Sequence, residues 1–268
     1  MITQSNFGLA FGLTLLAGLT TAIGGMVAFI TKKDNLKALS FGLGFSAGVM
    51  IFISLVDIVP GAESLLRVNF PNMYRWMVFG GFILGICISV LIDYFLPDHV
   101  DTDELLNPDD MEAAAHSHSK LKRAGILTAV ALCIHNFPEG MATFLTTTQD
   151  VTLGLSVAFA IAIHNIPEGI SVALPIYHVT GKKRYAMLYA ALSGITEPIG
   201  ALVGMFIFGL FVPHVLVGFL MAAVAGIMTY IAFDTLLPLA KEYGDWHLSI
   251  MGIISGILFI WSSIILLR

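Results

Sequence analysis

The sequence LCIHNFPEGMA at residues 132–142 is followed by a near copy, IAIHNIPEGIS, at residues 161–171. Both copies contain the hexapeptide His-Asn-x-Pro-Glu-Gly within a long apolar run. If these runs are helical, the His and the Glu of each copy are four residues apart and lie on one face. The stretch therefore predicts two consecutive apolar helices that carry equivalent polar groups.

Apolar runs of this kind extend over the whole chain. Hydrophobic residues make up 57% of the 268 residues and charged residues only 12%, whereas a soluble domain carries about 25% charged residues. Runs of about 20 apolar residues can cross a hydrocarbon core of roughly 30 Å. They lack strand alternation, so they are predicted to be helices. The class is an all-α polytopic membrane protein, with the lipid bilayer as its partner and no indication of nucleic-acid binding.

Eight transmembrane helices are expected, at residues 6–30, 38–60, 73–97, 124–146, 151–176, 185–210, 214–238 and 247–267. They would form one transporter-like domain over residues 1–268. Its one long soluble segment, 98–123, is acidic and contains His116 and His118. The plain interpretation of that segment is a disordered, solvated cytoplasmic loop, and a weak metal acceptor is the alternative.

Lysine and arginine are distributed unequally between the two sets of connections. Cytoplasmic loops contain more of these residues than loops on the other side. One set holds Lys32, Lys33, Lys37, Lys120, Lys122, Arg123, Lys182, Lys183, Arg184 and Lys241, and the other holds Arg67, Arg75 and Arg268. Both termini are therefore expected to be extracytoplasmic.

A second internal repeat connects the two ends of the chain. AGVMIFISLVDIVP at residues 47–60 aligns without gaps to AGIMTYIAFDTLLP at 225–238. These segments lie in the second and seventh spans, which would run in opposite directions. The pattern predicts an inverted repeat of helices 1–3 and 6–8 around a central hairpin of helices 4 and 5, an organisation common in transporters.

The hexapeptides would lie near the middle of the membrane. Because spans four and five are antiparallel, His135 should be level with Glu168, and Glu139 with His164. A carboxylate at that depth costs about 2.5–3.5 kcal/mol, and no Lys or Arg lies near the middle of a span to neutralise it. A divalent cation with nitrogen and oxygen ligands suits these donors. The alternative is that each His bonds to a neighbouring helix and each Glu is protonated.

The doubled motif, the eight spans and the outward termini resemble the ZIP (Zrt/Irt-like) family of divalent metal transporters, and within it the bacterial zinc-uptake type. The resemblance implies a site for one or two ions halfway across a bacterial inner membrane. One ion would be held by His135, Glu139, His164 and Glu168. The other would be held by Asn136, Asn165 and Glu197, sharing Glu139 and Glu168.

Three further residues are weaker candidates. Met50 matches a position at which the family supplies a donor from the second span, but methionine is as often plain core. Asp57 and Asp234, near the ends of spans two and seven, could line the entrance and the exit of the pathway, or be interfacial acids. Small-xxx-small pairs at Gly8/Gly12 and Gly81/Gly85 suit either a homodimer or packing within the bundle.

Uptake of Zn²⁺, with Fe²⁺, Mn²⁺, Co²⁺ or Cd²⁺ as further substrates, is the function that these features predict. No prosthetic group and no enzyme activity are expected. The alternative is an intramembrane zinc-dependent hydrolase, since such a site also pairs His with Glu around a metal. The usual His-Glu-x-x-His helix of zinc proteases is absent from the sequence.

Overall fold

The computed structural model describes residues 6–32, 35–95, 108–149, 151–208 and 214–267, which are helical wherever they have regular structure. The helices are α1 (Phe7–Gly25), α2 (Val27–Ile30), α3 (Leu36–Ile53), α4 (Val59–Asn69), α5 (Tyr74–Phe95), α6 (Pro108–Gln149), α7 (Val151–Thr180), α8 (Lys183–Gly194), α9 (Thr196–Phe208), α10 (His214–Tyr230), α11 (Leu237–Glu242) and α12 (Trp246–Leu267). Two π-helical segments, η2 (Ser54–Ile58) and η3 (Ile231–Leu236), join α3 to α4 and α10 to α11. The predicted all-α class is confirmed for these residues.

Seven helical segments among the described residues are long and apolar enough to cross a membrane. They are residues 7–30, 36–69, 74–94, 157–180, 183–206, 218–242 and 246–266. The predicted fourth span, 124–146, lies within α6 and is not one of the seven. His135, Asn136 and Glu139 lie in the middle of this stretch and lower its hydropathy.

The segment 98–123, expected to be a loop, is helical from Pro108 onwards. Residues 96–107 lie outside the described residues. The physical reason for the helix is local: a proline followed by Asp109 and Asp110 is a typical first turn, because proline needs no N–H there and acids favour the positive end of the helix. Residues 113–115 are alanines, which have the highest helix propensity.

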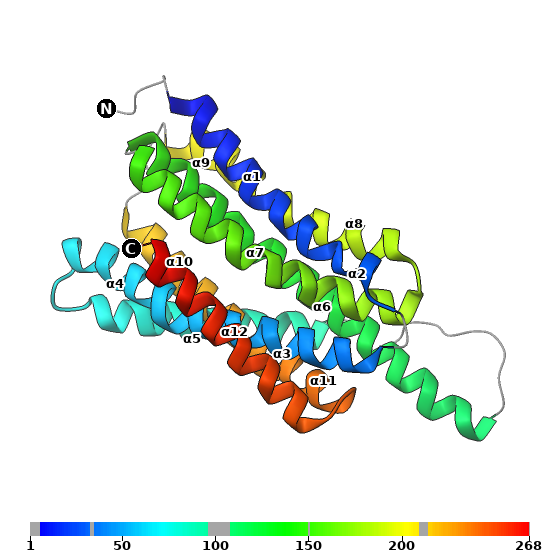
Figure 1. Ribbon diagram of the computed structural model, residues 1–268. Helices are drawn as coiled ribbons and strands as arrows, with labels where there is room; N and C mark the ends of the chain where they lie inside the picture. Colours follow the sequence, from blue (N-terminus) through cyan, green and yellow to red (C-terminus); the bar gives the residue numbers. More distant parts are fainter. Residues whose placement is uncertain (1–5, 33–34, 96–107, 150, 209–213, 268) are drawn as a thin grey trace.

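The helices form two layers (Figure 1). One layer contains α1 and α6–α9, and the other contains α3–α5 and α10–α12. The layers meet where α3 packs against α7 and where α10 packs against α6. In Figure 1, α1 begins and α12 ends at the same end of the bundle.

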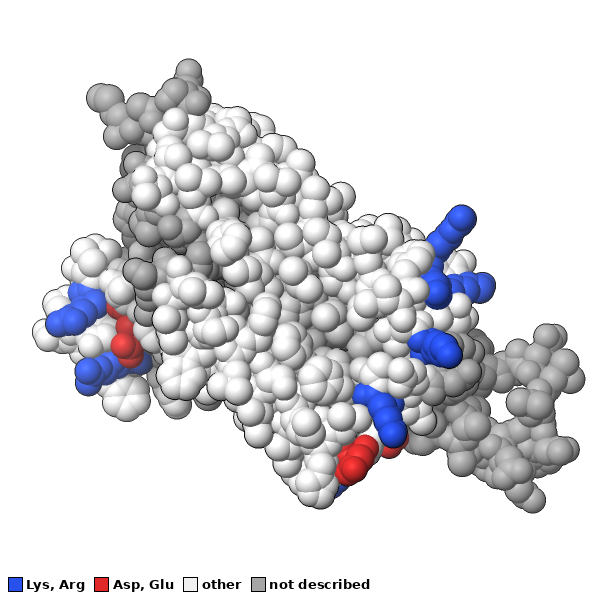
Figure 2. All heavy atoms as spheres, viewed as in Figure 1, with Lys and Arg blue, Asp and Glu red and all other residues white. Residues whose placement is uncertain are grey.

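The visible surface matches a membrane-spanning bundle. Figure 2 shows Lys and Arg gathered at the two ends of the molecule, with an uncharged belt between them on this face. Large apolar side chains are exposed along the helices, for example Phe79 at 57% and Leu258 at 56%. Such a surface is costly in water and favourable against lipid tails.

Glycines let the helices of the second layer approach backbone to backbone. A Cβ on Gly48 of α3 would overlap the carbonyl of Ile253 on α12, and a Cβ on Gly226 of α10 would overlap that of Phe82 on α5. Of the two small-xxx-small pairs, Gly81/Gly85 packs against α10 inside the bundle. A Cβ on Gly8 or Gly12 would meet no atom within 4 Å.

Candidate metal site between the layers

The two hexapeptides meet side by side in the first layer, on α6 and α7. Both helices stay helical through Pro138 and Pro167. Gly140 lets α6 approach α9, since a Cβ there would overlap the carbonyl of Glu197. Gly169 lets α7 approach α1 in the same way, with the carbonyl of Thr21. These close approaches pack α9 against the first motif and α1 against the second.

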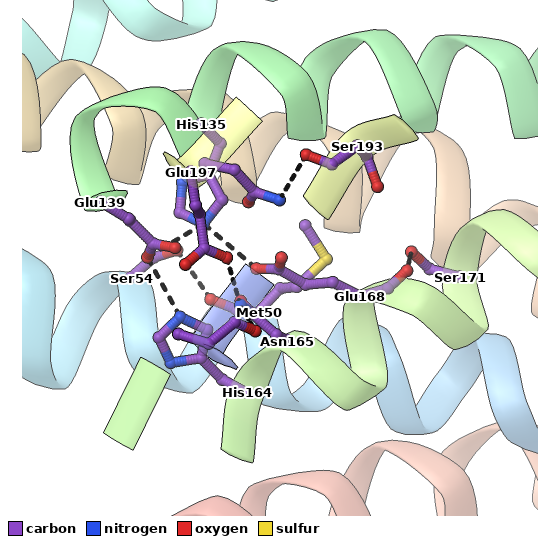
Figure 3. A network of polar contacts seen from close by, with 12 residues as sticks. Met50, Ser54, His135, Glu139, His164, Asn165, Glu168, Ser171, Ser193 and Glu197 are labelled. Atoms are coloured by element: carbon purple, nitrogen blue, oxygen red, sulfur yellow. Dashed lines mark hydrogen bonds and ion pairs between the residues drawn. The ribbon is translucent and has the colours of Figure 1, made fainter. Parts of the chain in front are cut away.

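The His and Glu side chains form an alternating chain of contacts (Figure 3). His135 Nε2 lies 3.1 Å from Glu168 Oε1 and 3.1 Å from Glu139 Oε1. His164 Nε2 lies 3.1 Å from Glu139 Oε1. The two pairings expected from antiparallel spans, His135 with Glu168 and His164 with Glu139, are thus present. One ligand atom from each of His135, His164 and Glu168 lies within 4.8 Å of the others.

The two Asn side chains are held by backbone carbonyls. Asn136 Nδ2 donates to the carbonyl of Ser193 at 3.1 Å, and Asn165 Nδ2 donates to that of Ala17 at 2.9 Å. Asn165 Nδ2 also donates to Glu197 Oε1. Because each amide nitrogen is engaged, each amide oxygen is left as the free acceptor.

This cluster is almost completely enclosed. His135, Asn136, Asn165, Glu168 and Glu197 are fully buried. Several of its acceptor atoms nevertheless have no hydrogen-bond partner: Asn136 Oδ1, Asn165 Oδ1, Glu139 Oε2, Glu168 Oε2 and Glu197 Oε2. Buried polar atoms normally have partners, and unpaired ones need an explanation. Converging anionic and amide oxygens beside two imidazoles are a ligand set for a divalent cation.

The weaker candidates lie in different surroundings. Met50 is fully buried on α3 and is drawn beside the cluster in Figure 3. Asp57, in η2, is exposed and lines a cavity of about 380 Å³ that reaches Glu139 and His164. Asp234, in η3, is also exposed, but it is not among the residues that line this cavity.

Sequence reasoning missed two kinds of residue in this region. The carbonyls of Ala17 and Ser193 orient the Asn amides, and backbone acceptors of this kind leave no mark in a sequence. Ser46 of α3 donates to the carbonyl of Pro167 at 2.6 Å, which ties the second layer to the motif helix. The only available signal was the presence of a hydroxyl residue inside a predicted span.

A helical membrane bundle with a buried His, Glu and Asn cluster at the junction of two layers defines a class: membrane proteins that handle divalent metal ions. The family model described as ZIP Zinc transporter matches residues 97–263. The chain is also 46% identical over 261 residues to the zinc transporter ZupT of Akkermansia muciniphila, covering 96% of this chain and 97% of that protein. The chain belongs to the ZIP family.

Other bacterial relatives show the same level of similarity. The zinc transporter ZupT of Nitratidesulfovibrio vulgaris is 46% identical over 265 residues, with 96% of each chain covered. That of Campylobacter jejuni is 47% identical over 279 residues, covering 95% of this chain and 94% of the relative. The similarity therefore extends over nearly the whole length of the protein.

Proposed function

We propose that this protein takes up Zn²⁺ through the buried cluster on α6 and α7, in the inner membrane of a bacterium, with Fe²⁺, Mn²⁺, Co²⁺ and Cd²⁺ as further substrates. The observation that carries the proposal is the set of buried acceptor atoms without partners next to His135 and His164. The zinc transporters among the relatives support the choice of zinc. Imidazole and carboxylate are common zinc ligands in proteins.

The residues of the cluster divide into two sets of ligands, one for each of two ions. His135, Glu139, His164 and Glu168 would hold one ion, with Met50 approaching from α3. Asn136, Asn165 and Glu197 would contribute to a second, with Glu139 and Glu168 shared. The contact between Asn165 and Glu197 supports the second group, because it places an amide and a carboxylate together beside the His and Glu chain.

The chain would cross the membrane eight times, with α6 providing the fourth crossing and both termini extracytoplasmic. The position of the start of α1 and the end of α12 at one end of the bundle supports an even number of crossings. Arg67 and Arg75 lie on the side expected to be outside, and the excess of Lys in the other connections supports the same orientation.

The first three and the last three membrane crossings would be related by an internal two-fold axis. This axis would pass through the α6–α7 pair, which forms the fourth and fifth crossings. Equivalent contacts support this. Gly18 of α1 and Gly194 of α8 each approach the other's carbonyl. Asn165 bonds to Ala17 of α1, and Asn136 bonds to Ser193 of α8, the residue equivalent to Ala17 when Gly18 is aligned with Gly194. Such repeats support alternating access, in which one layer moves against the other.

The alternative of an intramembrane zinc hydrolase has no observation in its favour. Both carboxylates of the motif pair contact imidazoles, and neither is set apart as a general base. Membership of the ZIP family favours transport. Because metal ligands must be deprotonated, we expect acid to weaken both zinc binding and uptake.

The test is zinc uptake by proteoliposomes that contain a fluorescent zinc indicator. Wild type is compared with the double variant Glu139→Ala, Glu168→Ala, and the expected result is flux that disappears in the variant. Both proteins should elute as monodisperse species from size exclusion, which serves as the control for folding. Absence of flux in a folded wild type that binds zinc would contradict the proposal.

A further inference from the structure

The cluster is open on one side and closed on the other. On the open side, Asp57 of η2 and Val157 of α7 both line the cavity. On the opposite side, η3 packs directly against α6. The exposure of the two motif carboxylates follows this difference, since the side chain of Glu139 is 11% exposed and that of Glu168 is 1% exposed.

The internal repeats give most of the residues that line the open side an equivalent on the closed side. The alignment of residues 47–60 with 225–238 pairs Asp57 with Thr235. The alignment of the two hexapeptides pairs Ala142 with Ser171 and Val157 with Thr128. Asp57, Ala142 and Val157 line the cavity. Their equivalents Thr235, Ser171 and Thr128 are 6%, 0% and 0% exposed.

At these three positions the closed side carries only hydroxyl residues, whereas two of the three positions on the open side are apolar. The hydroxyl of Ser171 donates to the carbonyl of Glu168 at 2.6 Å. Thr128 Oγ1 has no hydrogen-bond partner at all. A buried hydroxyl without a partner destabilises the state in which it is buried. A state of the protein that exposes this surface to water or to an ion would satisfy the Thr128 hydroxyl and remove that cost.

We propose that Thr128, Ser171 and Thr235 line the path by which the ion leaves the cluster, along a passage between η3 and the α6–α7 pair that is closed in this structure. The inference rests on the proposed function, because it requires an ion that passes through. Movement of the first layer against the second would open this passage and close the cavity at η2.

The chemistry of the two sides gives the passage a direction. Asp57 adds a negative charge where a hydrated cation would enter. Hydroxyl oxygens can replace water around a cation without adding charge, so they let it pass without retaining it. Conduction requires an ion to bind well enough to enter and weakly enough to leave. A carboxylate at η2 and hydroxyls at η3 therefore favour entry at η2 and release at η3.

The passage can be tested by thiol labelling. Ser171→Cys and Thr235→Cys are introduced separately into a background in which Cys87 and Cys133 are replaced by serine. A membrane-impermeant, charged methanethiosulfonate reagent is applied to intact cells and to inverted membrane vesicles. Both introduced cysteines should react from one face only, and Asp57→Cys should react from the opposite face.

Ser89→Cys is the matched control. Ser89, like Ser171, is a buried serine, but it lies on α5 and has no equivalent in the cavity lining. It should stay unreactive from both faces. A labelled Ser89→Cys would overturn the proposal, because burial in any part of the bundle would then be no barrier to the reagent.

A second variant measures release itself. Thr128→Val keeps the shape of the side chain and removes the hydroxyl. It should slow zinc flux several-fold while zinc binding to the purified protein is unchanged. Unchanged flux in this variant would overturn the role of Thr128.

The remaining outcomes separate the two proposals. If Ser171→Cys and Thr235→Cys carry zinc flux but react from neither face, or from the face of Asp57→Cys, the release path is wrong and the proposed function stands. If the protein without cysteines, folded and zinc-binding, carries no flux, the proposed function fails together with the release path.

Discussion

The two π-helical segments occupy equivalent places in the repeat but have different neighbours. In η2 the N–H of Val59 bonds to the carbonyl of Ser54, and in η3 the N–H of Leu237 bonds to that of Ala232. In both, a proline follows directly and has no N–H to donate four residues back. The segment η2 borders an open cavity, and η3 is packed against α6.

This comparison shows that the two π-helical segments are alike in their backbone and differ in their packing. π-helical turns are rare and are often found at functional sites. Here one lies on each side of the His and Glu cluster, at the junction where the layers meet. Since the local backbone is the same, the open and the closed side differ through side chains and through the relative position of the two layers.

The largest effect should come from the glycines that set the spacing of the second layer. Gly48→Val and Gly226→Val would each force a side chain into a facing carbonyl. Because backbone cannot yield as a side chain can, we expect losses of stability at or above the usual cost of overpacking, about 1–3 kcal/mol. Thermal unfolding in detergent measures them.

Gly80→Val is the control for this pair, since a Cβ at Gly80 meets no atom within 4 Å. Similar losses in Gly48→Val and Gly226→Val would support equivalent halves. A loss in only one of the two would break the comparison.

A second equivalent pair differs in charge. Glu197 of α9 and Thr21 of α1 stand in the same relation to Gly140 and Gly169, but only Glu197 carries a carboxylate. Glu197→Gln should weaken binding of a second ion by about tenfold or more, which corresponds to roughly 1.4 kcal/mol. The zinc content of the purified protein, titrated by mass spectrometry, measures this. Thr21→Val should leave the zinc content unchanged, and an equal loss in both variants would contradict the assignment.

The smallest effect should come from the acids in the π-helical segments. Asp57→Asn should raise the KM for zinc a few-fold and leave kcat unchanged, because Asp57 lines the cavity and attracts the cation from solvent. The effect should fade at high salt, since exposed charges are screened. Asp234→Asn is the matched variant, and its KM should change less. Uptake kinetics that reverse this order would assign the entrance to η3.

Much of the site could be predicted because the signal is local. Polar residues in an apolar run must have a partner, and the spacing of His135 and Glu139 fixes their common face. The pairing of His135 with Glu168 then followed from two antiparallel helices. Asp57 at the cavity and Asp234 away from it could not be separated in the sequence, because both are acids near a span end.

In the segment 98–123, by contrast, the sequence analysis missed a local signal for a helix. Its acidic composition indicated a solvated loop, although Pro108, Asp109 and Asp110 have the pattern of a helix start. The secondary structure of this region therefore follows local helix propensity and not net charge.

The sequence by itself determined the class, the apolar helices and the residues of the cluster, because apolar length and a repeated polar motif are properties of the chain. Only the tertiary structure decided which side of the cluster is open, which carbonyls orient the Asn amides, and where the unpaired hydroxyl of Thr128 lies. Those features depend on how two layers of helices pack against each other, and that relation is not carried by any single segment of the sequence.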